Sequence, residues 1–271
     1  MVFLGYAAAL LMGAVLGLVG GGGSILTVPI LVYLLAVEPK MATAYSLFVV
    51  GISSLVGAWT YARRRLVDFR TGAVFAVPSF IGVYVVRKYV MPALPSTIFS
   101  VGSFSVSQNS FILLVFAVVM VFAAGSMIKK PRTTKSPAAS DSGAGERKFN
   151  YPLIGLEGVV VGGVTGFVGA GGGFLIIPAL VILAGLEMKI AVGTSLVIIA
   201  VKSLVGFLGD VQSNSNMDWH LLLIFTSISI VGIVLGTAMS KKIPSEKLKP
   251  AFGWFVLLMG MFILARELLM S

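Results

Sequence analysis

Two glycine-rich stretches interrupt long apolar runs, and they constrain the fold of this chain more than any other feature. The first reads GLVGGGGSILTVP, residues 17–29, and the second reads GFVGAGGGFLIIP, residues 166–178. Backbone groups released from a helix inside a bilayer cost several kcal/mol each, unless protein or a water-filled cavity surrounds them. Two apolar runs that are broken in the same way therefore predict a protein-lined site at each break.

The composition places these breaks in a membrane. The chain is 58% hydrophobic with 11% charged residues, whereas about a quarter of the residues of a soluble domain are charged. A transmembrane helix needs about 20 largely apolar residues. The runs are continuously apolar, which excludes the alternating pattern of a β-barrel. The sequence predicts an all-α polytopic membrane protein with apolar segments at about 2–19, 24–37, 42–61, 71–86, 110–128, 152–168, 174–186, 190–208, 220–239 and 251–265.

The chain contains an internal duplication. Residues 13–57 align without a gap onto 162–206, and 21 of the 45 aligned positions are identical. A polar Ser/Ala/Gly/Pro-rich stretch separates the two copies. We therefore divide the chain into an N-terminal repeat (1–128), a cytoplasmic linker (129–150) and a C-terminal repeat (151–271).

The charges predict that the two repeats have opposite orientations. Fourteen of the twenty Lys and Arg residues lie in 62–70, 129–150 and 240–249, and basic loops are typically cytoplasmic. The loop 209–219 is acidic, which places it outside, yet it is the repeat equivalent of 62–70. Two inverted halves of five segments each are typical of secondary transporters. Arg87 and Lys88, on the predicted outer side, do not fit this pattern.

Several function classes are excluded by the residue inventory. The chain has no cysteine and one histidine, and its carboxylates do not cluster. We therefore expect no enzyme activity, no catalytic residues, no metal and no cofactor. Membrane topology accounts for the basic charge, so we expect no nucleic-acid partner. The expected partners are a small anionic substrate and the lipid bilayer of the cell inner membrane, with a homodimer left open.

Each glycine break offers an anion site. The half-helix that starts after a break has free N–H groups and about half a positive charge at its N-terminus, and glycine lets a ligand approach that backbone. A dinucleotide motif is excluded because G-x-G-x-x-G lacks its last glycine in both copies. The alternative is that the glycines only allow close helix packing, as in Gly13-x-x-x-Gly17 and Gly162-x-x-x-Gly166. The candidate binding residues at the breaks are Gly20, Gly21, Gly22, Gly23, Ser24, Thr27, Gly169, Gly171, Gly172 and Gly173.

Lys202 lies in the middle of an apolar run, where a charge costs about 2.5–3.5 kcal/mol. It can bind the anion, pair with Glu157 as a coupling residue, or extend toward the membrane surface. Hydroxyl residues on the helices that follow the breaks are further binding candidates, with hydrogen bonding to their own helix as the alternative. These residues are Tyr45, Ser46, Ser54, Thr194, Ser195 and Ser203.

Four loop charges and the histidine have simpler interpretations. Glu38, Lys40, Glu187 and Lys189 are expected to form short-loop ion pairs or caps, with gating as the alternative. His220 follows Asp218 and Trp219 and is expected to anchor a helix end at the membrane interface, with a metal or proton-relay role as the alternative.

The paired glycine motifs also carry a family resemblance. Each is followed by an acidic-x-Lys-x-Ala stretch, Glu38 to Leu47 in the first repeat and Glu187 to Leu196 in the second. This arrangement resembles the TauE/SafE family of sulfite exporters. The resemblance implies transport of sulfite, sulfoacetate or a related organosulfur anion. Tyr45, at the position of Thr194 in the second repeat, departs from the shared pattern.

The sequence therefore predicts an inner-membrane secondary transporter that binds a small anion at opposed half-helix N-termini near the midplane. No nucleotide-binding loop is present in the chain, so any energy coupling would use an ion gradient. Two other functions stay open at this point, a passive anion channel and a membrane scaffold without substrate.

Overall fold

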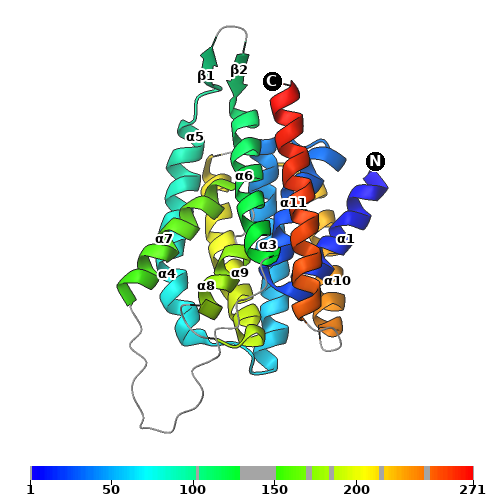
Figure 1. Ribbon diagram of the computed structural model, residues 1–271, viewed down its shortest axis with the longest axis vertical. Coiled ribbons are helices and arrows are strands. Elements are labelled where there is room, and N and C mark those ends of the chain that lie inside the picture. The colour runs from blue at the N-terminus through cyan, green and yellow to red at the C-terminus, as the bar shows by residue number, and fades with distance from the viewer. Residues whose placement is uncertain are drawn as a thin grey trace.

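The computed structural model describes residues 2–101, 104–128, 151–168, 173–182, 186–213, 217–240 and 245–270. Helices dominate this part of the chain (Figure 1). The long helices are α1 (Val2–Val19), α3 (Pro39–Arg63), α4 (Phe69–Val85), α6 (Gln108–Ile128), α7 (Tyr151–Val168), α9 (Met188–Ser213), α10 (Trp219–Met239) and α11 (Ser245–Met270). The short helical pieces are η1 (Gly21–Leu26), α2 (Thr27–Pro29), η2 (Ile30–Leu34), η3 (Val86–Val90), α5 (Met91–Ala93) and α8 (Gly173–Ile182).

These helices confirm the predicted apolar segments. Among the described residues, four helices are long and apolar enough to span a membrane: Pro39–Arg63, Phe69–Ala93, Met188–Gln212 and Trp219–Met239. Shorter apolar helices accompany them at Phe3–Val19, Gly23–Leu34, Gln108–Phe122 and Gly158–Val168. The chain therefore has the helical, multi-pass architecture that the composition predicts. The linker 129–150 lies outside the described residues.

Local signals set the helix starts. The Asp68 carboxylate accepts hydrogen bonds from the backbone N–H groups of Arg70 and Thr71 at 3.0 and 3.1 Å, and it caps α4. The Asp218 carboxylate caps α10 by accepting from Leu221 N–H at 3.0 Å. Such side-chain caps satisfy N–H groups that have no partner within the helix.

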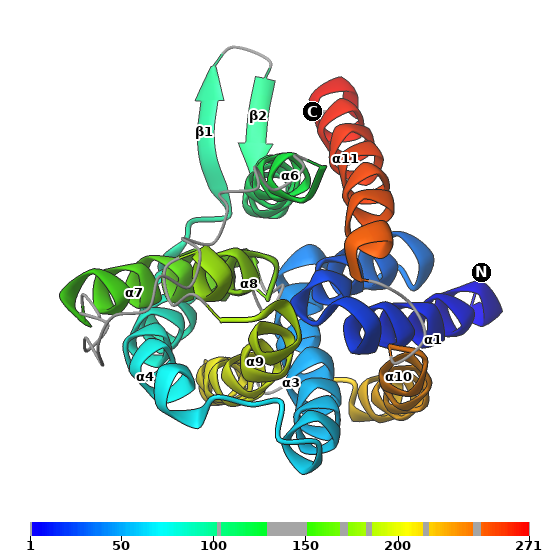
Figure 2. The same cartoon turned by 60° about the horizontal axis from the view of Figure 1, so that its bottom comes forward.

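The helices pack around a central pair (Figure 2). Helix α3 packs against α9, α1 packs along α10, and α4 packs along α7. Helix α6 packs against α11 at one side of this core. Each of the pairs α1–α10 and α4–α7 joins a helix from the first half of the chain to one from the second.

Glycines bring these helices close together, as predicted for Gly13-x-x-x-Gly17 and Gly162-x-x-x-Gly166. A Cβ at Gly13 would collide with the carbonyl oxygen of Ser229, and a Cβ at Gly162 would collide with that of Ser79. Contact between helix backbones through small residues is typical of membrane helix pairs. Gly13 and Gly162 therefore serve close helix packing.

The expectation of a wholly α-helical fold needs one correction. Strands β1 (Thr97–Val101) and β2 (Phe104–Ser107) pair antiparallel between α5 and α6. The hairpin extends beyond the helices at the top of Figure 1. It forms because Thr, Ile, Phe and Val alternate with serine there, and alternation with β-branched and aromatic residues favours a strand.

The segment after the first glycine break folds back along α1. A Cβ at Gly23 would meet Met12 and Leu16, and a Cβ at Gly5 would meet the side chain of Leu35. The two segments therefore run antiparallel, and both ends of this helical hairpin lie on the same side. The corresponding segment after the second glycine break is α8. Its 10 residues span about 15 Å, which is half the thickness of a hydrocarbon core.

The predicted topology can be tested with single cysteines, because the native chain contains none. Ser96→Cys, exposed beside the β-hairpin, should react with a membrane-impermeant maleimide in intact cells. Arg70→Cys, in a basic loop, should react only after permeabilisation, because basic loops stay on the cytoplasmic side. Labelling of Arg70→Cys from outside intact cells would overturn the assigned orientation.

Candidate functional site

The tips of the two broken helices touch each other. A Cβ built at Gly21 would collide with the backbone of Gly173, and a Cβ at Gly173 would collide with the Cα of Gly21. The backbone at Gly20 has φ +78°, a conformation that favours glycine. The first break thus requires glycine for its turn at Gly20 and for its approach to the second repeat at Gly21.

This contact explains a difference between the two breaks. The second repeat has Gly173 where the first has Ser24. A serine side chain at 173 has no space beside Gly21. Residues Gly169, Gly171 and Gly172 of the second break lie outside the described residues, so their assignment to the site stays a prediction.

The long helix of the second repeat borders the first tip. A Cβ at Gly20 would lie 3.3 Å from the Ser195 hydroxyl, 3.1 Å from Val192 and 3.0 Å from Ile177. Ser195 itself donates to the Val192 carbonyl at 2.8 Å. The first tip therefore lies against the predicted serine of the other repeat.

Several buried hydroxyl groups have no hydrogen-bond partner within the described residues. They belong to four of the predicted residues and to the repeat equivalent of Lys202. The five are Thr27, Ser46, Ser53, Ser54 and Ser203, and all of them are fully buried. A buried hydroxyl without a partner costs about 1–3 kcal/mol, so such groups are suited to a polar ligand.

The other predicted hydroxyls already have partners. Ser24 donates to the Gly21 carbonyl at 2.6 Å and stabilises the tip. The Tyr45 hydroxyl accepts from Asp218 N–H at 2.5 Å, and the Thr194 hydroxyl accepts from Asp68 N–H at 2.9 Å. Tyr45 and Thr194 are equivalent residues of the two repeats, and each anchors the start of a helix in the other repeat. Although Tyr45 differs from Thr194 in residue type, both hydroxyls therefore accept a hydrogen bond from an aspartate N–H at a helix start.

Lys202 is buried in the helix core, with 1% of its surface exposed. Its ammonium group donates to the Thr165 hydroxyl of α7 at 2.9 Å. The Glu157 side chain lies outside the described residues, so the pairing of Lys202 with Glu157 stays a prediction. Because the Thr165 hydroxyl is neutral, this contact gives Lys202 no counter-ion.

A buried ion pair joins Arg87 of η3 to Asp210 of α9, and sequence reasoning missed it. The guanidinium Nη1 lies 3.2 Å from the Asp210 carboxylate and donates to the Thr43 hydroxyl at 3.1 Å. Arg87 is fully buried. It is therefore not a topology signal, which explains why it violates the pattern of basic loops. No sequence signal connects residues 87 and 210, which are far apart in the chain.

The expected ion pairs among the four loop charges are not formed within the described residues, although Glu38 is the N-cap residue of α3. Within the described part of the chain, Glu38, Lys40, Glu187 and Lys189 form no ion pair with one another; Glu38 accepts a hydrogen bond from Asn109 instead. His220 is exposed in the first turn of α10. No group of three or more His, Cys, Asp or Glu side chains gathers among the described residues.

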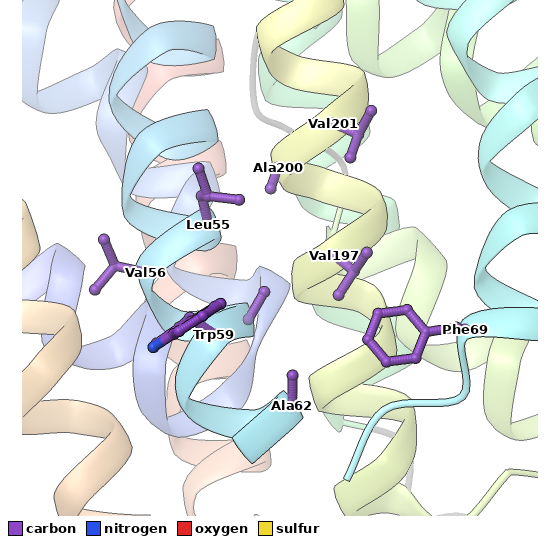
Figure 3. A pocket seen from close by; sticks show the side chains of 9 residues that line it. Leu55, Val56, Trp59, Ala62, Phe69, Val197, Ala200 and Val201 are labelled. Carbon is purple, nitrogen blue, oxygen red and sulfur yellow. The ribbon is translucent and has the colours of Figure 1, made fainter. Parts of the chain in front are cut away.

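An apolar groove lies on the surface of the α3–α9 pair (Figure 3). It has a volume of about 660 Å³ and apolar walls, among them Leu55, Trp59, Phe69, Val197 and Val201. Trp59 is 64% exposed and Phe69 is 63% exposed. The groove suits lipid chains, because all of its lining side chains are apolar apart from the Trp59 indole N–H.

Comparison with known proteins identifies the family. The profile described as sulfite exporter TauE/SafE matches residues 5–263. The chain belongs to the TauE/SafE family. It is 29% identical over 266 residues to the probable membrane transporter protein YunE of Bacillus subtilis, covering 93% of each chain. It is 27% identical over 260 residues to a probable membrane transporter protein of Xylella fastidiosa, covering 95% of this chain and 92% of that one. No solved structure matches.

Membership of the TauE/SafE family makes this chain a membrane transporter. The family and the names of the relatives indicate transport and not enzyme activity. The family match extends through both glycine breaks and all the long helices except the ends of α1 and α11. The site residues described above therefore lie within the family domain.

The contact between the tips predicts a large cost for a single methyl group. Gly21→Ala or Gly173→Ala should destabilise the protein by about 3 kcal/mol, the upper end of the overpacking range, because backbone opposes each Cβ. Gly163→Ala is the matched control, since its Cβ would lie 3.9 Å from the nearest atom. Thermal unfolding of the detergent-purified variants measures the difference. Equal unfolding temperatures for all three variants would contradict the contact.

The Arg87–Asp210 pair predicts a second effect on stability. Asp210→Asn should lower the unfolding free energy by about 3–5 kcal/mol, because it leaves the buried guanidinium without a counter-charge. The double variant Arg87→Met, Asp210→Asn should recover most of this loss, and thermal unfolding of the wild type, the two single variants and the double variant completes the cycle. A double variant as unstable as the sum of its single variants would show that the two residues are not coupled.

Proposed function

We propose that this transporter carries a small anion across the cell inner membrane and binds it where the two helical hairpin tips meet. The anion is sulfite, sulfoacetate or a related organosulfur anion. The observation that carries the proposal is the contact between Gly21 and Gly173, which brings together two broken helices from different halves of the chain.

The packing of the helices supports an inverted repeat. At the offset of about 149 residues, α1 corresponds to α7, α3 to α9 and α4 to α10. The contacts of α1 with α10 then correspond to those of α7 with α4, and α3 pairs with its own equivalent, α9. A two-fold axis through the α3–α9 pair explains this exchange. Transporters with inverted repeats typically bind substrate near the midplane, at discontinuous helices.

The electrostatics of the tips favour an anion. The returning segments η1 and α8 begin at Gly21 and Gly173, so their N-terminal ends meet. Each such end carries a partial positive charge and free N–H groups. An anion beside this contact would be attracted by both ends, and the glycines carry no Cβ that would block its approach to the backbone.

Lys202 adds a buried basic group to this region. It lies on the same face of α9 as Ser195, seven residues earlier, and among the described residues it contacts the neutral Thr165 hydroxyl. The buried hydroxyls of Ser46, Ser54 and Ser203 supply hydrogen-bond donors without partners. Together these groups favour a small oxyanion over a neutral or cationic substrate.

The identity of the anion comes from the family. The family description names sulfite exporters, and the relatives are described only as membrane transporters. A transporter should show saturable uptake and exchange of the anion across the membrane. A channel would give a flux proportional to concentration, and a scaffold would give none.

A lysine substitution tests the proposed site. Lys202→Met should reduce sulfite uptake into proteoliposomes at least about tenfold, because hydrogen bonds to charged groups contribute about 1.5–3 kcal/mol. Lys88→Met is the matched control, because Lys88 bonds to Tyr84 at the outer end of α4. Thermal unfolding with and without sulfite, sulfate, thiosulfate, taurine and sulfoacetate shows which anions the wild type binds.

Two results would overturn the proposal. One is a wild-type protein that neither transports nor is stabilised by any of these anions. The other is a Lys202→Met protein that transports like Lys88→Met. If Lys202 instead neutralises Glu157, Lys202→Met should be unstable, and the double variant Lys202→Met, Glu157→Gln should recover stability.

A further inference from the structure

A second, smaller pocket opens at the end of the molecule that the basic loops assign to the cytoplasm. Its volume is about 120 Å³. Two basic side chains and two hydroxyl residues contribute to its wall, beside three aliphatic residues. The lining residues are Leu18, Tyr61, Arg64, Leu66, Lys189, Val192 and Ser240.

The pocket ends one residue layer from the first hairpin tip. Val192 lines the pocket, and its side chain would lie 3.1 Å from a Cβ at Gly20. The Tyr61 hydroxyl donates to the Gly17 carbonyl at 3.3 Å, three residues before the break. The pocket and the proposed binding site are therefore separated by a thin layer of side chains, and a small movement of this layer would join them.

The positive charges of the pocket are not neutralised by protein. Within the described residues, Arg64 and Lys189 form no ion pair. Arg64 donates to the Thr237 carbonyl at 3.2 Å, which holds the guanidinium in place but uses few of its five N–H donors. Arg64 is half-buried, while Lys189 is exposed at the rim. Cations in a recess with low-dielectric walls attract anions more strongly than cations on open surface.

At the outer end of the molecule, the Arg87–Asp210 pair occupies the position that corresponds to this pocket in the internal repeat. Continuing the alignment along the same helices, Tyr61 corresponds to Asp210 and Lys189 to Lys40. There, the carboxylate of Asp210 neutralises Arg87 inside the protein. Within the described residues, the buried cation at the outer end, Arg87, thus has a counter-ion, whereas Arg64 in the cytoplasmic pocket has none.

We propose that the pocket formed by Arg64, Lys189, Tyr61 and Ser240 is a capture site for a small oxyanion arriving from the cytoplasm. This inference rests on the proposed function and assigns a second anion site on the same path. A volume of about 120 Å³ equals that of roughly four water molecules in the liquid. It accommodates a small oxyanion such as sulfite and excludes a nucleotide.

Sulfite uptake into everted membrane vesicles tests the capture site, because such vesicles present the cytoplasmic face to the medium. Arg64→Gln should raise the apparent KM for radiolabelled sulfite about tenfold, as expected for the loss of a charged hydrogen-bond donor. Arg63→Gln is the matched control, because its guanidinium lies over the Trp59 ring, 5.0 Å from the ring centre, and not in the pocket. The maximal rate should change less than KM.

Lys189→Gln keeps the test decisive if Arg64→Gln fails to fold, because the Lys189 side chain is exposed. It should also raise KM, whereas Lys40→Gln, its equivalent at the outer end, should not. Added potassium gluconate should raise the wild-type KM by screening the pocket, and this salt effect should be weaker in Arg64→Gln.

The outcomes separate the two proposals. If the wild type transports sulfite and the pocket variants behave like Arg63→Gln and Lys40→Gln, the capture site is wrong and the proposed function stands. If wild-type vesicles take up neither sulfite nor thiosulfate, taurine or sulfoacetate, the proposed function fails and the capture site fails with it.

Discussion

A broken helix in a bilayer is tolerated only where protein covers its free backbone groups, and this requirement organises the whole structure. The first break is covered by the second repeat, with Gly21 against Gly173 and Gly20 against Ser195. Helices α3 and α9 pack beside the tips and complete the enclosure. Because each tip depends on the other repeat, neither half can enclose its own break. The glycine pattern therefore determines how the two halves must meet.

Buried charge and buried hydroxyl groups add a second level of organisation. The Arg87–Asp210 pair is neutral as a unit and closes one end of the core. Lys202 contacts only a neutral hydroxyl among the described residues, and five fully buried Ser and Thr hydroxyls lack partners there. The two buried cations thus differ, because Arg87 has a counter-ion and Lys202 contacts a neutral group. A polar ligand beside the five hydroxyls would supply the partners that the described residues do not.

The helices and the glycine contacts could be predicted from sequence because they depend on local apolar runs and on a duplicated motif. The β-hairpin could also have been predicted, since Thr97 to Ser107 alternates around Gly102-Ser103, a typical two-residue hairpin sequence. The Arg87–Asp210 pair could not, because it joins residues 123 positions apart without any local pattern. Tyr45 and Thr194 were predicted as binding residues, whereas their hydroxyls accept from the backbone N–H groups of Asp218 and Asp68, partners that no local sequence pattern indicates.

The exchange of partners between the halves has a consequence for biogenesis. Helix α1 packs along α10, and the glycine face of α1 at Gly13 and Gly17 is covered by Ser229 and Ile233. During synthesis α1 leaves the ribosome more than 200 residues before α10. Until nearly the whole chain has been synthesised, the glycine face of α1 must therefore be exposed to lipid or shielded by an insertion factor. Under the proposed inverted repeat, a half-length ancestor would have assembled as an antiparallel pair inserted in both orientations.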